Sequence, residues 1–215
     1  MGSAEAETET EGSGPVVEEA VVEGAVVEGA VVGGTPVSAA KSRIVSAATA
    51  LFGEHGVGGT SLQMIADAIG VTKAAVYHQF KTKDEIVIAV AQAELARVAA
   101  VLDSAVAQPD PMAAREVLLS GMVDLAIARR HLESALTSDP VLNRFFAQHE
   151  PFLTLMDRLY LVLLGEDSPD ARLSGAMLTA AIGGAVMHPM LQGLDDAALR
   201  AQLLRLARSF LGLPG

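Results

Sequence analysis

Apolar residues along the first third of the chain recur at the spacing of helix faces. One face is predicted over residues 39–55 and a second over 62–69. The residues on these faces are Ile44, Ala48, Leu51 and Phe52 in the first helix and Leu62, Ile65, Ala66 and Ile69 in the second. Glycines follow both stretches, and Thr60 and Ser61 are natural N-caps for the second helix. The pattern therefore predicts two helices separated by a glycine-rich break.

A third, short helix is predicted immediately after Gly70. Thr72 is a suitable N-cap, and the helix would carry the residues from Lys73 to His78 before a long helix starts near Lys83. Gly70 can take the positive φ that a tight turn requires, and the small Ala66 lets the two short helices cross closely. Two short helices joined by a turn of about three residues that contains glycine are typical of a helix-turn-helix.

The segment TSLQMIADAIGVTKAAVYHQFKTKDEI resembles the DNA-binding domain of the TetR family of bacterial transcription regulators. The matching features are Thr60 at the start of the second helix, the Gly70 turn, Thr72 at the start of the third, the run Tyr77-His78-Gln79-Phe80, and Lys83. The resemblance covers roughly residues 41–90; the remainder agrees only in length and helical character. It implies an all-α fold, in which a three-helix helix-turn-helix DNA-binding domain precedes a C-terminal helical ligand-binding and dimerisation domain.

The resemblance also implies which side chains contact DNA. The third helix would enter the major groove with Lys73, Ala74 and His78 near base edges. The residues expected to hold phosphates are Thr60, Thr72, Tyr77 and Lys83. Two alternatives stay open: Tyr77 could be a core residue with a solvated hydroxyl, and the two lysines could be ordinary solvated surface.

The C-terminal part is predicted to contain about five helices, separated by Pro- and Gly-containing breaks. Arg129 falls on the apolar stripe of a helix near 114–136, and His149 interrupts the next stripe, where Pro151 should kink or restart the helix. One hypothesis is that both anchor a ligand in an apolar pocket walled by Met122, Met156 and Tyr160. The alternatives are that Arg129 pairs with a local acid, that His149 is satisfied within the fold, and that the methionines are plain core.

The stretch 173–194 contains no charged residue, but its glycines and polar residues argue against a membrane span. Ala176, Ala180 and Gly184, spaced by four, would let another helix approach closely. Helices near 169–192 and 195–211 are therefore predicted to form half of a four-helix homodimer interface, as the resemblance also implies. The alternative is that both helices only close the core of one subunit.

Charge is distributed unevenly along the 215 residues, whose formal net charge is −11. Residues 1–40 hold eight Glu and no Lys or Arg, whereas residues 41–90 hold five basic and four acidic residues. The valine-rich pentads at 20–34 fit neither helix nor strand periodicity, so residues 1–37 are interpreted as a disordered, acidic, low-complexity tail. The tail would be a solubilising arm, or an arm that competes with DNA for basic side chains. Residues 38–85 and 86–215 would form the two domains.

No residue pattern for catalysis, metal binding or cofactor binding is found in the sequence. Without cysteine there is no thiolate ligand or nucleophile, and the five histidines show no metal-ligand spacing. The favoured interpretation is a cytoplasmic, homodimeric transcriptional regulator, a repressor released from a palindromic DNA operator by a small, largely apolar or amphipathic effector. The alternative is a helical protein–protein interaction module with an acidic tail that no longer binds DNA, supported by the weak positive charge of residues 41–90.

Overall fold

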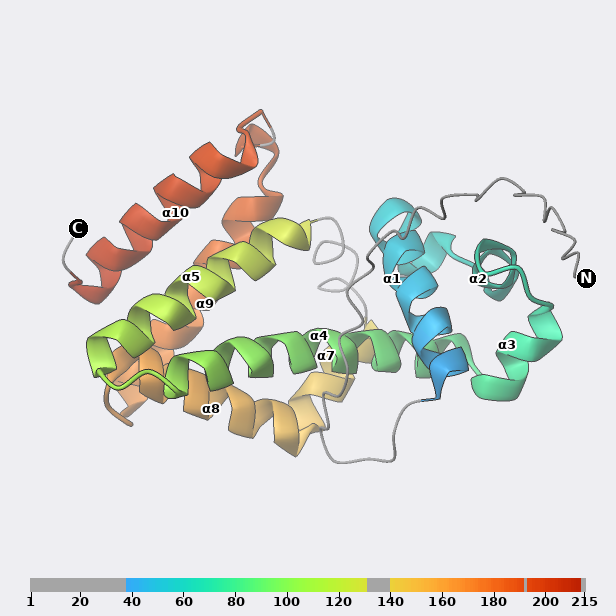
Figure 1. Cartoon of the computed structure of the whole chain (residues 1–215), viewed down its shortest axis with the longest axis horizontal. Helices are drawn as coiled ribbons and strands as arrows, with labels where there is room; N and C mark the ends of the chain where they lie inside the picture. Colours follow the sequence, from blue (N-terminus) through green and yellow to red (C-terminus); the bar gives the residue numbers. More distant parts are fainter. Residues whose placement is uncertain (1–37, 131–139, 192, 214–215) are drawn as a thin grey trace, which may run out of the picture.

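The computed structural model describes residues 38–130, 140–191 and 193–213, and this part of the chain is helical with no strand (Figure 1). The predicted tail at 1–37 lies outside the described residues. The helices are α1 (Ala39–Gly59), α2 (Leu62–Ala68), α3 (Lys73–Gln79), α4 (Lys83–Val106), α5 (Pro111–Ala128), α7 (Pro140–Gln148), α8 (Glu150–Leu164), α9 (Pro169–Met187) and α10 (Asp196–Leu211), with a short 3₁₀ turn at Pro189–Leu191. The predicted all-α class is confirmed.

Helix starts are set by polar side chains that satisfy the first free backbone N–H groups. In each of these N-caps the side chain accepts a hydrogen bond from the backbone three residues later. The Ser, Thr and Asp residues that do so are Ser38, Ser61, Thr72, Thr82, Asp110, Ser168 and Asp195. The predicted starts of the second, third and fourth helices are therefore confirmed to within a residue.

Two glycines form the breaks that the sequence predicted. Gly56 has φ 70° and ψ 165° inside α1, so the regular helix ends there and one further turn follows. Gly70 has φ 68° and forms the turn between α2 and α3. A side chain at either position would be strained in this backbone conformation. The helix-turn-helix thus has the predicted geometry.

The buried apolar residues form two clusters that share α4. The N-terminal cluster comprises Ile44, Ala48, Phe52, Val57, Ile65, Ala66, Val76, Phe80, Ile86, Val87, Val90, Ala91 and Leu142. The C-terminal cluster is built from α5, α8, α9, α10 and the far end of α4, where Leu102 and Ala105 are buried. The predicted boundary between residues 85 and 86 therefore falls near the start of a helix that belongs to both clusters.

Helix α7 is an unexpected contributor to the N-terminal cluster. Leu142 is buried in that cluster, and Phe145 and Phe146 pack against it although they lie far along the sequence. Helix α4 runs between the two ends of the molecule, with α3 at one end of the long axis and α10 at the other (Figure 1). Side chains of α7, which belongs to the C-terminal half of the sequence, therefore contact the unit that carries α3.

Two predicted helices are shorter in the structure. The helix expected over 114–136 ends at Ala128, where Arg129 forms the C-cap, and residues 131–139 lie outside the described part of the chain. The helix expected over 169–192 ends at Met187, just before Pro189, whose ring cannot continue a helix. None of the described helices is both long enough and apolar enough to cross a membrane.

Candidate nucleic-acid interface

Helix α3 is anchored by one face and exposed on the other. Val76 is fully buried and Phe80, its C-cap, is 6% exposed, so these two side chains hold the helix on the N-terminal cluster. Lys73, Ala74 and His78 are all exposed. The structure therefore places the three predicted base-edge residues together on the outward side of a short helix, where a groove could receive them.

Thr72 and Tyr77 border this outward face. The Thr72 hydroxyl accepts a hydrogen bond from Ala75 N at 3.2 Å, which caps the helix while the side chain stays exposed. Tyr77 is 43% exposed, and the Lys73 ammonium lies 5.7 Å from the centroid of its ring. The alternative in which Tyr77 is a core residue does not hold. Its hydroxyl is free to reach a phosphate, and the ring positions the lysine beside it.

Thr60 does not belong to this surface, and its prediction as a phosphate contact is wrong. The residue is only 2% exposed, and its hydroxyl donates to the carbonyls of Leu51 and Gly56 at 3.1 and 2.8 Å. Ser61, not Thr60, is the N-cap of α2. The extra turn after Gly56 leaves carbonyls that the threonine satisfies, which explains why this residue is turned into the fold.

Lys83 is likewise engaged inside the domain. Its ammonium donates to the carbonyl oxygens of Val57 at 2.7 Å and Thr60 at 3.1 Å, in a half-buried position. These bonds tie the start of α4 to the end of α1. Because two of its three ammonium hydrogens are used within the fold, Lys83 is chiefly a structural residue. One hydrogen remains for an outside acceptor.

Three basic residues that the sequence analysis did not select also lie around α3. Arg43 donates to the carbonyl of Ile69 at 2.9 Å, beside the turn, and the Lys41 ammonium lies 5.5 Å from the centroid of the Phe80 ring. Lys81 donates to the carbonyls of Tyr77 and His78 at the end of α3. Arg43 is 26 residues from Ile69 in sequence. Only the packing of α1 brings it here, and no local pattern signals that.

Five basic side chains lie in this unit, and we call them the cationic set: Lys41, Arg43, Lys73, Lys81 and Lys83. None of the five forms an ion pair with a carboxylate among the described residues. Their partners are backbone carbonyls and aromatic rings. The only charge pair recorded within residues 38–90 joins His55 to its neighbour Glu54. The five cations therefore form no direct ion pair within residues 38–90, although the four carboxylates of residues 41–90 leave that unit a net charge of only +1.

Comparison with known proteins places this unit in a family. Residues 44–90 match the sequence model described as "Bacterial regulatory proteins, tetR family". Over 121 residues the chain is 27% identical to an HTH-type transcriptional repressor of Mycobacterium tuberculosis, and over 68 residues it is 29% identical to the HTH-type transcriptional repressor AcnR of Corynebacterium diphtheriae. These matches span 52% and 32% of this chain, and 59% and 36% of the two repressors.

The whole fold also matches solved structures. A TetR/AcrR-family transcriptional regulator from Thermobifida fusca is 27% identical with a TM-score of 0.57, covering 78% of this chain and 95% of the other. The fatty acid degradation regulator FadR from Bacillus halodurans has a TM-score of 0.65 at 18% identity, covering 80% of this chain and 96% of the other. Residues 44–90 therefore match the TetR family, and the described helices as a whole are similar in arrangement to TetR-family structures.

In the C-terminal helices, the two polar residues predicted to anchor a ligand have partners inside the fold. Arg129 caps α5 and lies 3.3 Å from Glu94, which confirms the alternative of a local acid. His149 is the N-cap of α8: its Nδ1 accepts from Phe152 N at 3.1 Å, and its ring lies 4.3 Å from that of Phe145. Pro151 follows in the first turn of α8, so the predicted restart is confirmed.

The three residues predicted to wall the pocket also belong to the core. Met122, Met156 and Tyr160 are partly buried and pack against the C-terminal cluster. The Tyr160 ring lies directly against Gly175, and its hydroxyl is 3.4 Å from that of Thr179. Neither of the two hollows found among the described residues is lined by any of the five predicted ligand residues. The structure does not bring these five residues together around a cavity.

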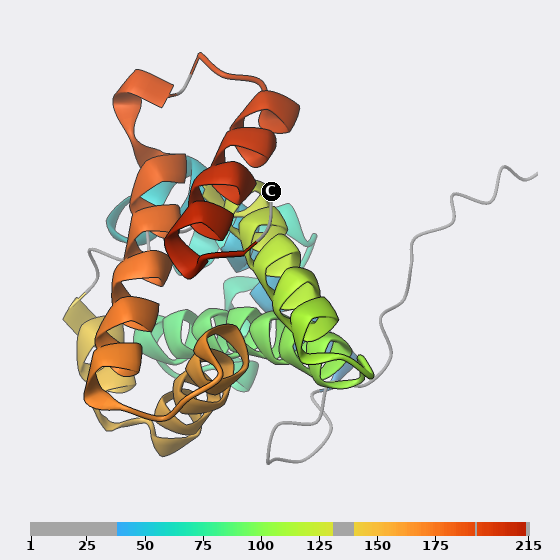
Figure 2. The same ribbon diagram turned by 90° about the vertical axis from the view of Figure 1, so that its left-hand side faces the viewer.

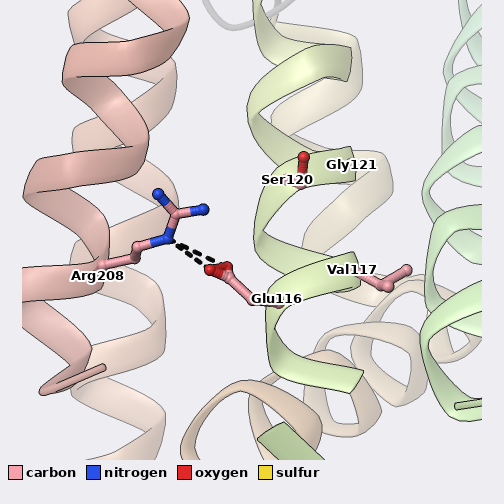
Figure 3. Close-up of a pocket in the computed structure, with 5 residues that line it drawn as sticks. All are labelled: Glu116, Val117, Ser120, Gly121 and Arg208. Carbon is pink, nitrogen blue, oxygen red and sulfur yellow. Dashed lines mark hydrogen bonds and ion pairs between the residues drawn. The ribbon is translucent and has the colours of Figure 1, made fainter. Parts of the chain in front are cut away.

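The larger hollow, about 390 Å³, lies instead between α5 and α10 (Figure 3). Arg208 of α10 reaches across to Glu116 of α5, and Arg200 donates to the Ser120 hydroxyl at 2.6 Å and to Asp124 at 3.0 Å. The hydrogen bonds to Asp124 and Glu116 raise the pKa values of Arg200 and Arg208 above their ordinary range. Both arginines are therefore charged at every relevant pH and connect the two helices.

Helices α9 and α10 lie at the end of the molecule opposite α3 (Figure 1 and Figure 2), and both carry exposed apolar side chains. Leu173 and Met177 on α9 are 61% and 55% exposed, and Leu206 and Phe210 on α10 are 55% and 49% exposed. The small residues Ala176, Ala180 and Gly184 lie exposed on α9, and a Cβ at Gly184 would meet nothing within 4 Å. This surface combines exposed apolar side chains with the small residues that close helix packing requires.

Proposed function

We propose that this chain is a TetR-family DNA-binding transcriptional regulator, a repressor that acts in the cytoplasm, and not an enzyme. The observation that carries the proposal is the outward face of α3, whose Lys73, Ala74, Tyr77 and His78 are exposed beside cations with no carboxylate partner. Such a helix is suited to the major groove, with base edges read by Lys73 and phosphates held by Thr72 and Tyr77. The two repressors that match part of the chain support the same function.

A homodimer through α9 and α10 is the second part of the proposal. The exposed apolar residues of these two helices would bury one another across a two-fold axis, and the small residues of α9 would allow close approach. Because α3 lies at the far end of each subunit, the dimer would present two reading helices to two half-sites of a palindrome. The alternative that both helices only close one subunit's core leaves these apolar side chains in water.

Control by a small apolar or amphipathic effector is the third part. Since the five residues predicted for its site already have partners, an effector would need α5, α8 and α9 to move apart and would bind a less populated state. Helix α7 offers a route to the DNA-binding unit, because Leu142, Phe145 and Phe146 contact the N-terminal cluster. The effector would lower DNA affinity only as far as it binds the open state more tightly than the closed one.

The test of DNA reading is fluorescence anisotropy with duplexes from the region upstream of the chain's own gene. Specific binding is expected, and Lys73→Ala should weaken it by ~1–3 kcal/mol, or roughly five- to 150-fold, because it removes both a base contact and a charge. Tyr77→Phe should weaken it less, by a single phosphate hydrogen bond. Arg158→Ala on α8, outside the proposed DNA and dimer surfaces, is the matched control and should change nothing. Equal affinity for upstream and random duplexes, or insensitivity to Lys73→Ala, would favour the protein-interaction module instead.

A further inference from the structure

We propose that the Glu-rich segment 5–28 of this chain binds the cationic set around α3 and competes there with DNA. The competition with DNA rests on the proposed DNA-binding function, whereas the contact between segment 5–28 and the cationic set does not. The segment contains eight carboxylates and no Lys or Arg, so it is a polyanion like the nucleic acid it would displace. The carboxylates are those of Glu5, Glu7, Glu9, Glu11, Glu18, Glu19, Glu23 and Glu28.

The segment is joined to the folded unit next to α3. Ser38 is the first described residue and the N-cap of α1. One turn later Lys41 lies over the ring of Phe80, at the end of α3, and Arg43 bonds the carbonyl of Ile69 at the turn that precedes α3. The start of α1 therefore lies beside both ends of the reading helix, and any chain that precedes Ser38 starts out from this surface.

The acidic residues are within reach of the cationic set. Glu28 is ten residues before Ser38, and ten extended residues span at most about 33–36 Å. Helix α3, at seven residues, is only about 10 Å long. A tether of this length would hold the carboxylates at an effective concentration on the order of millimolar. Weak ion pairing is then sufficient for the surface to be occupied much of the time.

The cationic set is the best available target for this polyanion. Its members have no carboxylate partner among the described residues, whereas seven of the ten arginines after residue 90 are already ion-paired. The segment would therefore meet more cations without a carboxylate partner around α3 than along the C-terminal helices. Salt would weaken the contact, since each exposed pair is screened over about 10 Å at 0.1 M.

The contact is tested without DNA by a single spin label. Because the chain has no cysteine, Ala20→Cys gives one unique attachment point. In the full-length protein the label should broaden the backbone amide signals of Lys73, Ala74 and Ala75, and 0.5 M salt or Gln at all eight Glu positions should restore them. Replacing Val21, Val22, Val26 and Val27 by Ser is the matched control that keeps every charge, and broadening should persist. Undisturbed α3 signals in the wild-type background, or broadening that survives the Gln set, would overturn the proposal.

The competition is tested by DNA affinity of the same full-length proteins. The Gln set should bind a duplex about three- to tenfold more tightly, since apparent affinity falls with the fraction of protein whose surface is free. Its salt dependence should also be steeper, because wild-type DNA binding displaces the segment in place of small ions. Unchanged affinity would overturn the competition. If α3 signals are broadened but neither protein binds DNA, the contact stands and the proposed function fails.

Discussion

The two halves of the molecule use their positive charges in opposite ways. Before residue 90 there are five cations, four of them lysines, and none pairs with a carboxylate among the described residues. After residue 90 all ten cations are arginines, and seven of them form ion pairs. A planar guanidinium suits fixed pairing with a carboxylate, whereas a lysine is a mobile point charge. The N-terminal cations are therefore suited to binding an anion from outside the domain, whereas the C-terminal arginines connect helices.

The arginine pairs also show what holds the C-terminal helices in register. Arg200 and Arg208 join α10 to α5, Arg129 joins the end of α5 to α4, and Arg130 reaches Asp196 at the start of α10. These contacts link elements 35 to 92 residues apart in the sequence. In the N-terminal unit the corresponding long-range bonds run from Arg43 and Lys83 to backbone carbonyls, which leaves the net charge of the surface intact.

The largest predicted effect tests whether these two halves are one folding unit. Phe52→Ala empties a fully buried site in the N-terminal cluster and should cost roughly 3–5 kcal/mol. Because α4 contributes buried residues to both clusters, urea denaturation followed by circular dichroism should still show one transition. Met190→Ala, at an 86% exposed position, should change stability by less than about 0.5 kcal/mol. A separate second transition for the C-terminal helices would divide the molecule into independent units.

The second prediction distinguishes Lys83, which has a structural role, from Lys73, which is proposed to contact base edges. Lys83→Ala removes two hydrogen bonds from an ammonium to half-buried carbonyls and should lower the free energy of unfolding by roughly 1.5–3 kcal/mol. Lys73→Ala, on the exposed face of α3, should stay within about 0.5 kcal/mol of wild type. Thermal unfolding of both variants makes the comparison. Equal losses of stability would show that the two lysines have the same role.

The smallest effect concerns the arginine pairs. A double-mutant cycle on Arg200 and Asp124 should give a coupling energy of about 0.5–1 kcal/mol, at the upper end for exposed pairs, because the guanidinium bonds both the carboxylate and Ser120. The pair Arg158–Asp103, at 3.6 Å and more exposed, is the matched control and should give a few tenths at most. The coupling should shrink in 1 M salt. Equal coupling energies in the two cycles would show that the arginine pairs do not hold α5 and α10 together.

The N-terminal unit was predictable because its signals are local. Gly70, Thr72 and the apolar spacing of Ile65, Ile69 and Val76 act within a few residues of each other, and caps and turns follow the same local chemistry in the structure. The prediction for Thr60 failed although its cause is local: the extra turn after Gly56 directs the Thr60 hydroxyl to the carbonyls of Leu51 and Gly56, nine and four residues back. Arg43 was missed because only the packing of α1 brings it to the turn.

The C-terminal half was less predictable because polar residues on an apolar stripe have two explanations. Arg129 and His149 stand at helix ends, where backbone groups and Glu94 satisfy them, so the helix before Arg129 ends there and the stripe around His149 is divided between α7 and α8. The burial of Leu142 in the opposite cluster had no signal in the local pattern. The exposed apolar strip of α9 was anticipated, since the spacing of Ala176, Ala180 and Gly184 survives in the fold.

The most direct test is the salt dependence of binding to a random-sequence duplex, measured by anisotropy. One variant replaces Lys41, Lys73 and Lys81 by Gln, and its matched control replaces Arg97, Arg158 and Arg205 by Gln. The lysine variant should lose roughly one to three units from the slope of log K against log salt, at about 0.9 for each phosphate contact removed. The arginine variant should keep the wild-type slope. Equal slopes for the two variants would contradict the assignment of the unpaired N-terminal cations to DNA.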